Sequence, residues 1–340
     1  MKYIGNKKRV LNFIEECLID SKIDYKNKKV CDLFAGTGSV SNFFLQNNCI
    51  VFSCDNMTYS ICEQYRINYF TSIPFFDELS PFIRSNNVLD VINFLNSLEG
   101  KKGYFFENYA PSGMYGRKYF SDKNAAKIDA IADCIDAWKQ ILSSDKLYYL
   151  NGIFMCAADK VSNTSGTYGA YLKIWRSMAL KDMILEVPPI TSNGKNLIFQ
   201  EDVIDFVKKY KKFDILYLDP PYNERQYASN FHVLENIVVN DKQELLGKTG
   251  LRDYNNQKSD FCNKKKALNS FRELVLNTDS KYIVMSYSTE GILSEDDITS
   301  ILERRGEVNV YRTNYRRFKT NSWTSNNTGL QELLFVCSCK

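Results

Sequence analysis

The tetrapeptide Asp219-Pro220-Pro221-Tyr222 directly follows a run of mainly apolar residues, 213–218. Proline has no amide hydrogen and a fixed φ, so carbonyl groups in this turn remain available as acceptors. An amino group conjugated to a nucleobase is a poor nucleophile because its lone pair is delocalised into the ring. If the Asp219 carboxylate and the Pro220 carbonyl accepted its two hydrogens, the nitrogen would become pyramidal and its lone pair available. Tyr222 could stack on a base that has left its duplex. The tetrapeptide therefore predicts group transfer to a nucleobase amino group.

A second motif, Asp-Leu-Phe-Ala-Gly-Thr-Gly at residues 32–38, lies between a predicted strand and a predicted helix. Glycines at Gly36 and Gly38, next to Ala35, let the backbone approach a ligand closely. Asp55 ends the next predicted strand, where a carboxylate can bind the two hydroxyls of a ribose. A dinucleotide-binding loop would have a third glycine at the position of Ser41. The carboxylate of Asp32 instead suits a cationic ligand, so the set predicts S-adenosylmethionine binding.

Both motifs require strands to position them, and the apolar pattern supplies these. Short apolar runs predict strands over 29–34, 50–54, 196–199, 214–218, 282–286 and 333–337. The first two flank a predicted helix and form a β-α-β unit, which is the start of a parallel sheet. In such sheets ligands bind beyond the carboxyl ends of the strands, so the two motifs should face one crevice. The predicted fold class is α/β, with a Rossmann-like sheet.

The middle of the chain has a different pattern. Apolar residues at helical spacing predict long helices over 124–142 and 147–161, and prolines punctuate the surrounding segments. We therefore expect a catalytic domain made of residues 1–70 and 196–340. A mainly helical insert, 71–195, is the candidate target-recognition region.

The two motifs, together with the N-terminal Tyr3-Ile4-Gly5-Asn6-Lys7, resemble those of the DNA adenine amino-methyltransferases that use S-adenosylmethionine. Their order along the chain matches the alpha group of that family. The resemblance implies that Tyr3, Gly5 and Lys7 lie near the methionine end of the cofactor, with Asp32 and Gly36 close by. It also implies that Asp202 binds the cofactor's adenine amino group, and that Asp219 and Tyr222 carry the chemistry. Asp219 is expected to contact the cofactor as well. The double-stranded DNA substrate would be methylated as the modification half of a restriction–modification pair, with a cognate endonuclease as possible partner.

Two segments are candidates for DNA contact. Residues 304–319 mix arginines with aromatic residues, which suits phosphate contact and base stacking. The residues proposed there are Arg312, Arg316, Arg317 and Lys319. In the insert, the loop of residues 163–173 is rich in hydrogen-bonding side chains, so it could read DNA bases or could be an ordinary helix cap. The candidates there are Asn163, Thr167 and Tyr168. The lysines at 258 and 264–266 are equally consistent with a solvated face, and His232 is interpreted as a packed helix residue.

Composition excludes several classes of protein. The 340 residues carry a formal net charge of +4 with 44% hydrophobic residues, which suits a globular chain and does not by itself imply nucleic-acid binding. No apolar run reaches the roughly 18 residues of a membrane helix, and no signal-peptide core follows the basic N-terminus. Ten scattered cysteines fit a cytoplasmic location. With a single histidine and one close cysteine pair, we expect no metal site.

Other functions remain open from the sequence. The runner-up is a ribosomal RNA base amino-methyltransferase, since related tetrapeptides occur there, although the large insert favours DNA. A binding module that lost catalysis is disfavoured because Asp32, Asp55, Asp219 and Tyr222 are all present. A nicotinamide dehydrogenase would need the missing third glycine.

Overall fold

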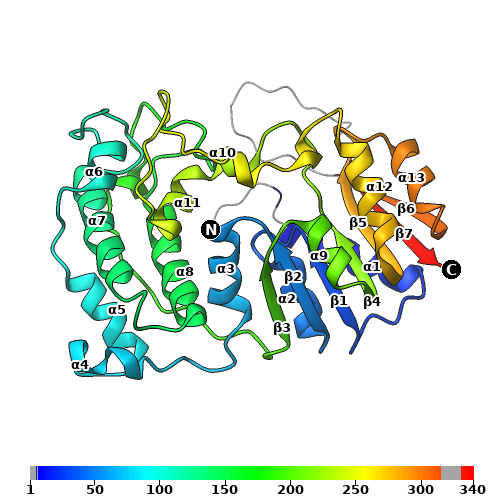
Figure 1. Cartoon of the computed structure of the whole chain (residues 1–340), viewed down its shortest axis with the longest axis horizontal. Coiled ribbons are helices and arrows are strands. Elements are labelled where there is room, and N and C mark those ends of the chain that lie inside the picture. The colour runs from blue at the N-terminus through cyan, green and yellow to red at the C-terminus, as the bar shows by residue number, and fades with distance from the viewer. Residues whose placement is uncertain (1–4, 6, 315–330) are drawn as a thin grey trace. The chain divides into compact units, whose positions relative to one another are not determined.

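The computed structural model describes residues 5, 7–314 and 331–340. The chain forms two compact units. One contains residues 57–191 and 228–255 and is helical. The other contains residues 5–56, 192–227 and 256–340 and holds the sheet (Figure 1). Among the described residues, no helix combines the length and the apolar character needed to span a bilayer.

The sheet unit contains seven described strands in the order β3-β2-β1-β4-β5-β7-β6 (Figure 1). Their bounds are β1 (Lys29–Leu33), β2 (Ile50–Asp55), β3 (Asn196–Gln200), β4 (Lys212–Leu218), β5 (Asp279–Ser288), β6 (Gly306–Asn314) and β7 (Gln331–Cys339). The first five are parallel, whereas β7 runs antiparallel to both β5 and β6. The order reverses at β1 and β4, so the crevice expected for ligands lies at their carboxyl ends.

Helices cover both faces of this sheet. Alternating residues of the strands point to opposite faces, and each face has its own buried cluster. Val30 and Val51 pack with the helices α1 (Leu11–Asp20) and α2 (Ser39–Gln46). Cys31 and Leu33 pack with α9 (Val203–Lys209), α12 (Ala267–Asn277) and α13 (Glu295–Leu302). The α/β Rossmann-like fold class expected from the sequence is therefore confirmed.

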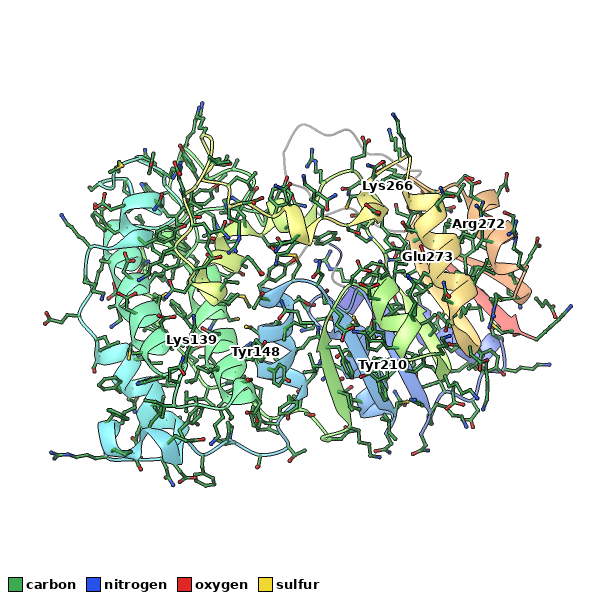
Figure 2. The ribbon with its side chains drawn as sticks, in the orientation of Figure 1. Lys139, Tyr148, Tyr210, Lys266, Arg272 and Glu273 are labelled. Carbon is green, nitrogen blue, oxygen red and sulfur yellow. The ribbon has the colours of Figure 1, made fainter. Side chains whose placement is uncertain are left out.

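The helical unit is built around α3 (Thr58–Asn68) and α8 (Ser144–Lys160). Gly152 of α8 allows these helices to touch, because a Cβ there would lie 2.3 Å from the Cys62 carbonyl oxygen. Tyr148, labelled in Figure 2, stacks on Tyr65 with ring centroids 5.0 Å apart. The other α-helices that lie wholly in this unit are α4 (Ser80–Ile83), α5 (Val88–Ser97), α6 (Tyr104–Tyr109), α7 (Asp122–Ala137) and α11 (His232–Val239). The short helix α10 (Tyr227–Asn230) has three of its four residues there. The helices expected over 124–142 and 147–161 correspond to α7 and α8.

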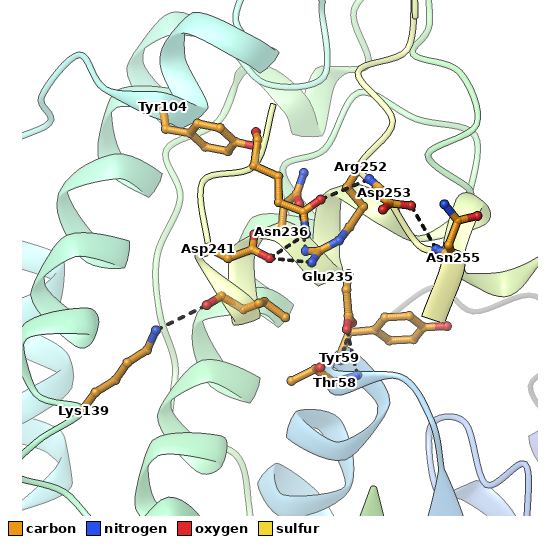
Figure 3. A network of polar contacts seen from close by, with 12 residues as sticks. Thr58, Tyr59, Tyr104, Lys139, Glu235, Asn236, Asp241, Arg252, Asp253 and Asn255 are labelled. Atoms are coloured by element: carbon orange, nitrogen blue, oxygen red, sulfur yellow. Dashed lines mark hydrogen bonds and ion pairs between the residues drawn. The ribbon is translucent and has the colours of Figure 1, made fainter. Parts of the chain in front are cut away.

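A polar network, buried at Glu235, Asn236 and Arg252, ties α11 to its neighbours within the helical unit (Figure 3). Glu235 accepts hydrogen bonds from the backbone amides of Thr58 and Tyr59, which caps the start of α3. Arg252 donates to Asn236 at 2.9 Å and to Asp241 at 2.8 Å. Residues 228–255 thus belong with the helices rather than with the sheet.

The single histidine of the chain is structural. His232 lies in α11 with no exposed surface, and its Nε2 lies 3.0 Å from the Tyr168 carbonyl oxygen. Burial lowers its pKa to about 4, so it is neutral at physiological pH. The interpretation of His232 as a packed helix residue is confirmed.

Candidate active site

The loop after β1 adopts a conformation that glycine favours. Gly36 has a φ of +51° and Gly38 a φ of +67°, in the left-handed region. Gly38 also caps the start of α2. The Ala35 amide donates to the Cys54 carbonyl oxygen at 3.1 Å, and the Gly36 amide donates to the Asp55 carboxylate at 2.8 Å. The glycine loop therefore lies beside the carboxyl end of β2, with Asp55 next to its backbone.

Asp32 is a buried carboxylate at the end of β1, only 1% exposed. The hydroxyl of Ser41, from the first turn of α2, donates to it at 2.6 Å. Ser41 stands where a dinucleotide-binding loop would have its third glycine, and its side chain here partly satisfies the carboxylate. The serine that replaces the third glycine of the dinucleotide pattern therefore has a role of its own, which is to donate a hydrogen bond to Asp32.

Asp219 follows β4 directly and lies next to the glycine loop. In the sheet, Leu33 of β1 pairs with Leu218 of β4, and the Asp219 amide lies 3.4 Å from the Leu33 carbonyl oxygen. The Asp219 side chain keeps 20% of its surface exposed, so a ligand can reach it. Pro220 is buried, whereas Tyr222 is half-buried, and the Tyr222 carbonyl accepts a bond from the Ile292 amide at 3.0 Å. The structure brings Asp32, Asp55 and Asp219 together at one edge of the sheet.

Lys7 supplies a positive charge to this edge. Its ammonium lies 3.1 Å from Asp219 and 2.5 Å from Glu332, the second residue of β7. The hydroxyl of Ser286, on β5, donates to the same Glu332 oxygen at 2.6 Å. Lys7, Glu332 and Ser286 are all buried. Sequence reasoning placed Lys7 near the site but missed Glu332 and Ser286. The signal available for Glu332 was a charged residue directly before the apolar run 333–337.

Burial raises the pKa of two carboxyls of this edge, Asp32 and Asp219. It raises the pKa of Asp32 to about 7, with Asp219 and Asp55 adding to the rise and Ser41 opposing it. Burial likewise raises the pKa of Asp219 to about 6, a rise that Lys7 opposes and Glu332 increases. The pKa of Lys7 is raised well above its ordinary value by Asp219 and Glu332, although burial opposes this. Four carboxyls and one ammonium leave an excess of negative charge, which favours a cationic ligand.

The remaining candidate cofactor residues occupy different settings. Gly5 has a φ of +84°, and a Cβ there would lie 3.0 Å from the Tyr227 hydroxyl, so glycine suits this position. Asp202 is exposed and caps α9 by accepting a bond from the Ile204 amide at 2.8 Å. Tyr3 lies outside the described residues. Within the described residues, no cluster of histidine, cysteine and acidic side chains could hold a metal ion.

The candidate DNA-reading loop differs from expectation. Asn163 is buried, and its amide bonds the backbone of Lys118, Leu172 and Arg176. Tyr168 is also fully buried, with its hydroxyl donating to Asp159 at 2.8 Å. These two side chains hold the loop together and present no polar group to a base, which corrects their placement as base contacts. The physical reason is that both side chains make hydrogen bonds inside the helical unit.

Thr167 keeps partial exposure in the same loop and remains a candidate. Arg312 is exposed near the end of β6, where its guanidinium contacts Glu295. Arg316, Arg317 and Lys319 lie outside the described residues. The basic, aromatic stretch predicted as a surface for DNA therefore begins as a strand, β6, which the sequence reading did not identify.

The lysines near residue 260 are exposed and paired locally. Lys266, labelled in Figure 2, lies 3.0 Å from Asp260, and Lys264 lies 3.6 Å from Glu224. Such exposed pairs contribute little energy, and they are typical of a solvated face.

Comparison with known proteins supplies the family. A family model described as D12 class N6 adenine-specific DNA methyltransferase matches residues 3–301. The chain is 35% identical to the type II methyltransferase M.NlaIII of Neisseria lactamica, over 96% of this chain and 95% of that protein.

Two longer proteins are similar to the chain as well. The modification methylase StsI of Streptococcus sanguinis is 38% identical over 100% of this chain and 52% of its own length. The type II methyltransferase M.FokI of Planomicrobium okeanokoites is 37% identical over 94% of this chain and 50% of its own length. The chain therefore spans about half the length of these two relatives and nearly all of M.NlaIII.

Proposed function

The chain belongs to the D12 class of N6 adenine-specific DNA methyltransferases, which use S-adenosylmethionine, and on that premise we propose how its residues act. Asp219 and the Pro220 carbonyl accept the two hydrogens of the adenine amino group. The observation that carries this proposal is the position of a partly exposed Asp219 beside the glycine loop at the carboxyl edge of the sheet. Family membership also favours DNA over the ribosomal RNA alternative.

The donor set at this edge suits the cofactor. S-adenosylmethionine carries a ribose, an ammonium and a cationic sulfur. When bound, it supplies the methyl group from that sulfur. Asp55, whose carboxylate already lies beside the loop backbone, would bind the ribose hydroxyls. Asp32 and the net negative charge of the cluster would favour the cationic end. Gly5, Ala35, Gly36 and Gly38 would let the backbone approach it closely, with Lys7 and Asp202 at its two ends.

Asp219 acts on the base in the proposed reaction. With a pKa of about 6 the carboxyl is mostly ionised at pH 7 to 8, so it can accept a hydrogen bond from N6. Each accepted bond draws the nitrogen out of conjugation and exposes its lone pair toward the methyl donor. The positive charge that develops on N6 is stabilised by the same carboxylate. The proton then leaves without a strong base, because the methylated ammonium is very acidic, and the neutral His232 is not needed.

The target adenine must leave the duplex to reach Asp219. Tyr222 belongs to the same tetrapeptide as Asp219 and is half-buried, and it would stack on the extruded base. Phosphate contacts from Arg312 and from Arg316, Arg317 and Lys319 would set affinity, and contacts from the insert, including Thr167, would select the sequence. The helical insert of residues 71–195 is thus proposed as the main part of the target-recognition region.

The relatives named modification methylases and type II methyltransferases suggest a role in restriction–modification. We propose that this chain protects host DNA from a cognate endonuclease. DNA from a host that expresses the chain should be sequenced with modified-base detection, beside DNA from a host expressing Asp219→Ala. N6-methyladenine at one recurrent sequence, present only with the unaltered chain, supports the proposal. Methylation of ribosomal RNA with none on DNA would contradict it.

A further inference from the structure

A buried chain of contacts runs away from Asp219 toward the antiparallel part of the sheet. Lys7 lies between two carboxylates, 3.1 Å from Asp219 and 2.5 Å from Glu332, and Ser286 donates to Glu332 at 2.6 Å. Glu332 is 6% exposed and Lys7 is 8% exposed. From this geometry we infer that Glu332, with Ser286, positions Lys7 so that its ammonium sets the orientation and charge of Asp219. The inference rests on the proposed role of Asp219.

The topology explains how a residue so late in the chain reaches the site. Strand β7 runs antiparallel to β5, and Glu332 pairs with Ser288 at the carboxyl end of β5. The start of β7 therefore lies at the same edge of the sheet as the ends of the parallel strands. Glu332 lies beyond residues 3–301, the stretch that the family model matches.

A purely structural role would not need this arrangement. Glu332 is a buried carboxylate in a strand whose next residues are leucines. Such a carboxylate is costly without a partner. Lys7 pairs with Glu332 as well as with Asp219, so Glu332 shares a cation that would otherwise pair with Asp219 alone. A fully committed ammonium would make Asp219 a weaker acceptor for the amino hydrogens. Lys7 favours the ionised form of Asp219, and sharing its ammonium with Glu332 leaves Asp219 able to bind the base.

Titratable groups from four parts of the chain interact with Asp219. They are Lys7 from the N-terminal segment, Glu332 from β7, Tyr217 from β4 and Asp32 from β1. Lys7 lowers the pKa of Asp219, and Glu332 raises it. The two substitutions should therefore move the pH dependence of methyl transfer in opposite directions, which a change in packing alone would not do.

The test measures the single-turnover rate of DNA methylation against pH for Glu332→Gln, Lys7→Met and the double variant. Glu332→Gln should lower the plateau rate about tenfold, since a mispositioned acceptor costs rate steeply. The acid limb of the pH–rate profile of Glu332→Gln should move to lower pH by about one unit. The acid limb of Lys7→Met should move to higher pH. In the Lys7→Met background, Glu332→Gln should have little further effect on the plateau rate, because its partner is gone.

Glu273→Gln is the matched control. Glu273, labelled in Figure 2, is an exposed carboxylate on α12 that pairs with Lys208 at 2.8 Å. This variant should keep both the rate and the pH profile. Ser286→Ala keeps the charge of Glu332 while removing one donor, so it should fold even if Glu332→Gln does not, and should lower the plateau rate by a few-fold.

Two results would overturn the inference. In the first, Glu332→Gln has the same plateau rate and the same acid limb of the pH–rate profile as the unaltered protein. If Glu332→Gln does not fold, the same result from Ser286→Ala counts instead. The other is an equal loss from Glu332→Gln with and without Lys7. If the unaltered protein methylates no DNA, the proposed function fails instead, and the two failures are thereby distinguished.

Discussion

Asp32→Asn should change how the stability of the protein depends on pH. Asp32 is buried, and burial raises its pKa from 3.8 to about 7. A carboxyl with a raised pKa binds its proton more tightly in the folded state than in the unfolded state. The folded protein therefore loses stability as pH rises through the window from about 4 to about 7. Asparagine does not ionise, so the variant should lack this loss.

The size of the effect follows from the shift in pKa. A rise of about three units corresponds to about 4 kcal/mol at a pH above both pKa values, as an upper limit. The asparagine amide hydrogens would be left in a buried position, which costs about 1–3 kcal/mol at any pH. Without cofactor, we expect Asp32→Asn to be more stable than the unaltered protein by about 1–3 kcal/mol at pH 8. At pH 4 it should be less stable by about the same amount.

Urea unfolding at several values between pH 4 and pH 8 measures this difference. Asp205→Asn is the matched control, because it makes the same substitution at an exposed position of α9. Calorimetry should show that Asp32→Asn also binds S-adenosylmethionine more weakly. A stability difference for Asp32→Asn that stays constant over this range would refute the reasoning from burial.

Asp55→Ala should weaken cofactor affinity by about 1–3 kcal/mol, measured by calorimetry, because a charge-assisted contact is lost; turnover at saturating cofactor should change little, and an unchanged affinity would remove Asp55 from the site. In a salt titration of duplex binding, Arg312→Ala and Arg316→Ala should weaken binding to all duplexes. Each should also lower the steepness of the dependence of log affinity on log salt concentration by about one unit. Thr167→Ala should instead change the preference for the cognate duplex in the same titration, with an unchanged slope. Asn163→Ala should lower the free energy of unfolding by about 3 kcal/mol, since its buried amide makes three backbone bonds; selectivity that changes without loss of stability would restore it as a base contact.

Much of the catalytic sheet could be predicted from the sequence because local pattern and tertiary role agree there. The apolar runs that became β1, β2 and β4 end in residues of distinctive chemistry, and a parallel sheet places such ends at one edge. The link between Ser41 and Asp32 was not visible, because only the turn of α2 brings the hydroxyl to the carboxylate.

The misjudged features depend on contacts between distant segments. The sequence predicts a basic surface where β6 lies, because the polar residues that alternate along this strand give little sign of burial, although pairing with β7 places it in the sheet. The polarity of Asn163 suggested an exposed loop, yet its amide serves backbone groups inside the helical unit. Glu332 could be recognised only once β7 was known to start beside the end of β5.

The most direct test of the account is the single-turnover methylation rate of Asp219→Ala with a duplex that carries the cognate site. Asp219 is proposed to act mainly on the adenine amino group and to contribute little to cofactor affinity. The variant should therefore bind S-adenosylmethionine with little change and lose on the order of 10²–10³ in rate, or more. Near-normal methylation of adenine N6 by Asp219→Ala would contradict the proposed mechanism.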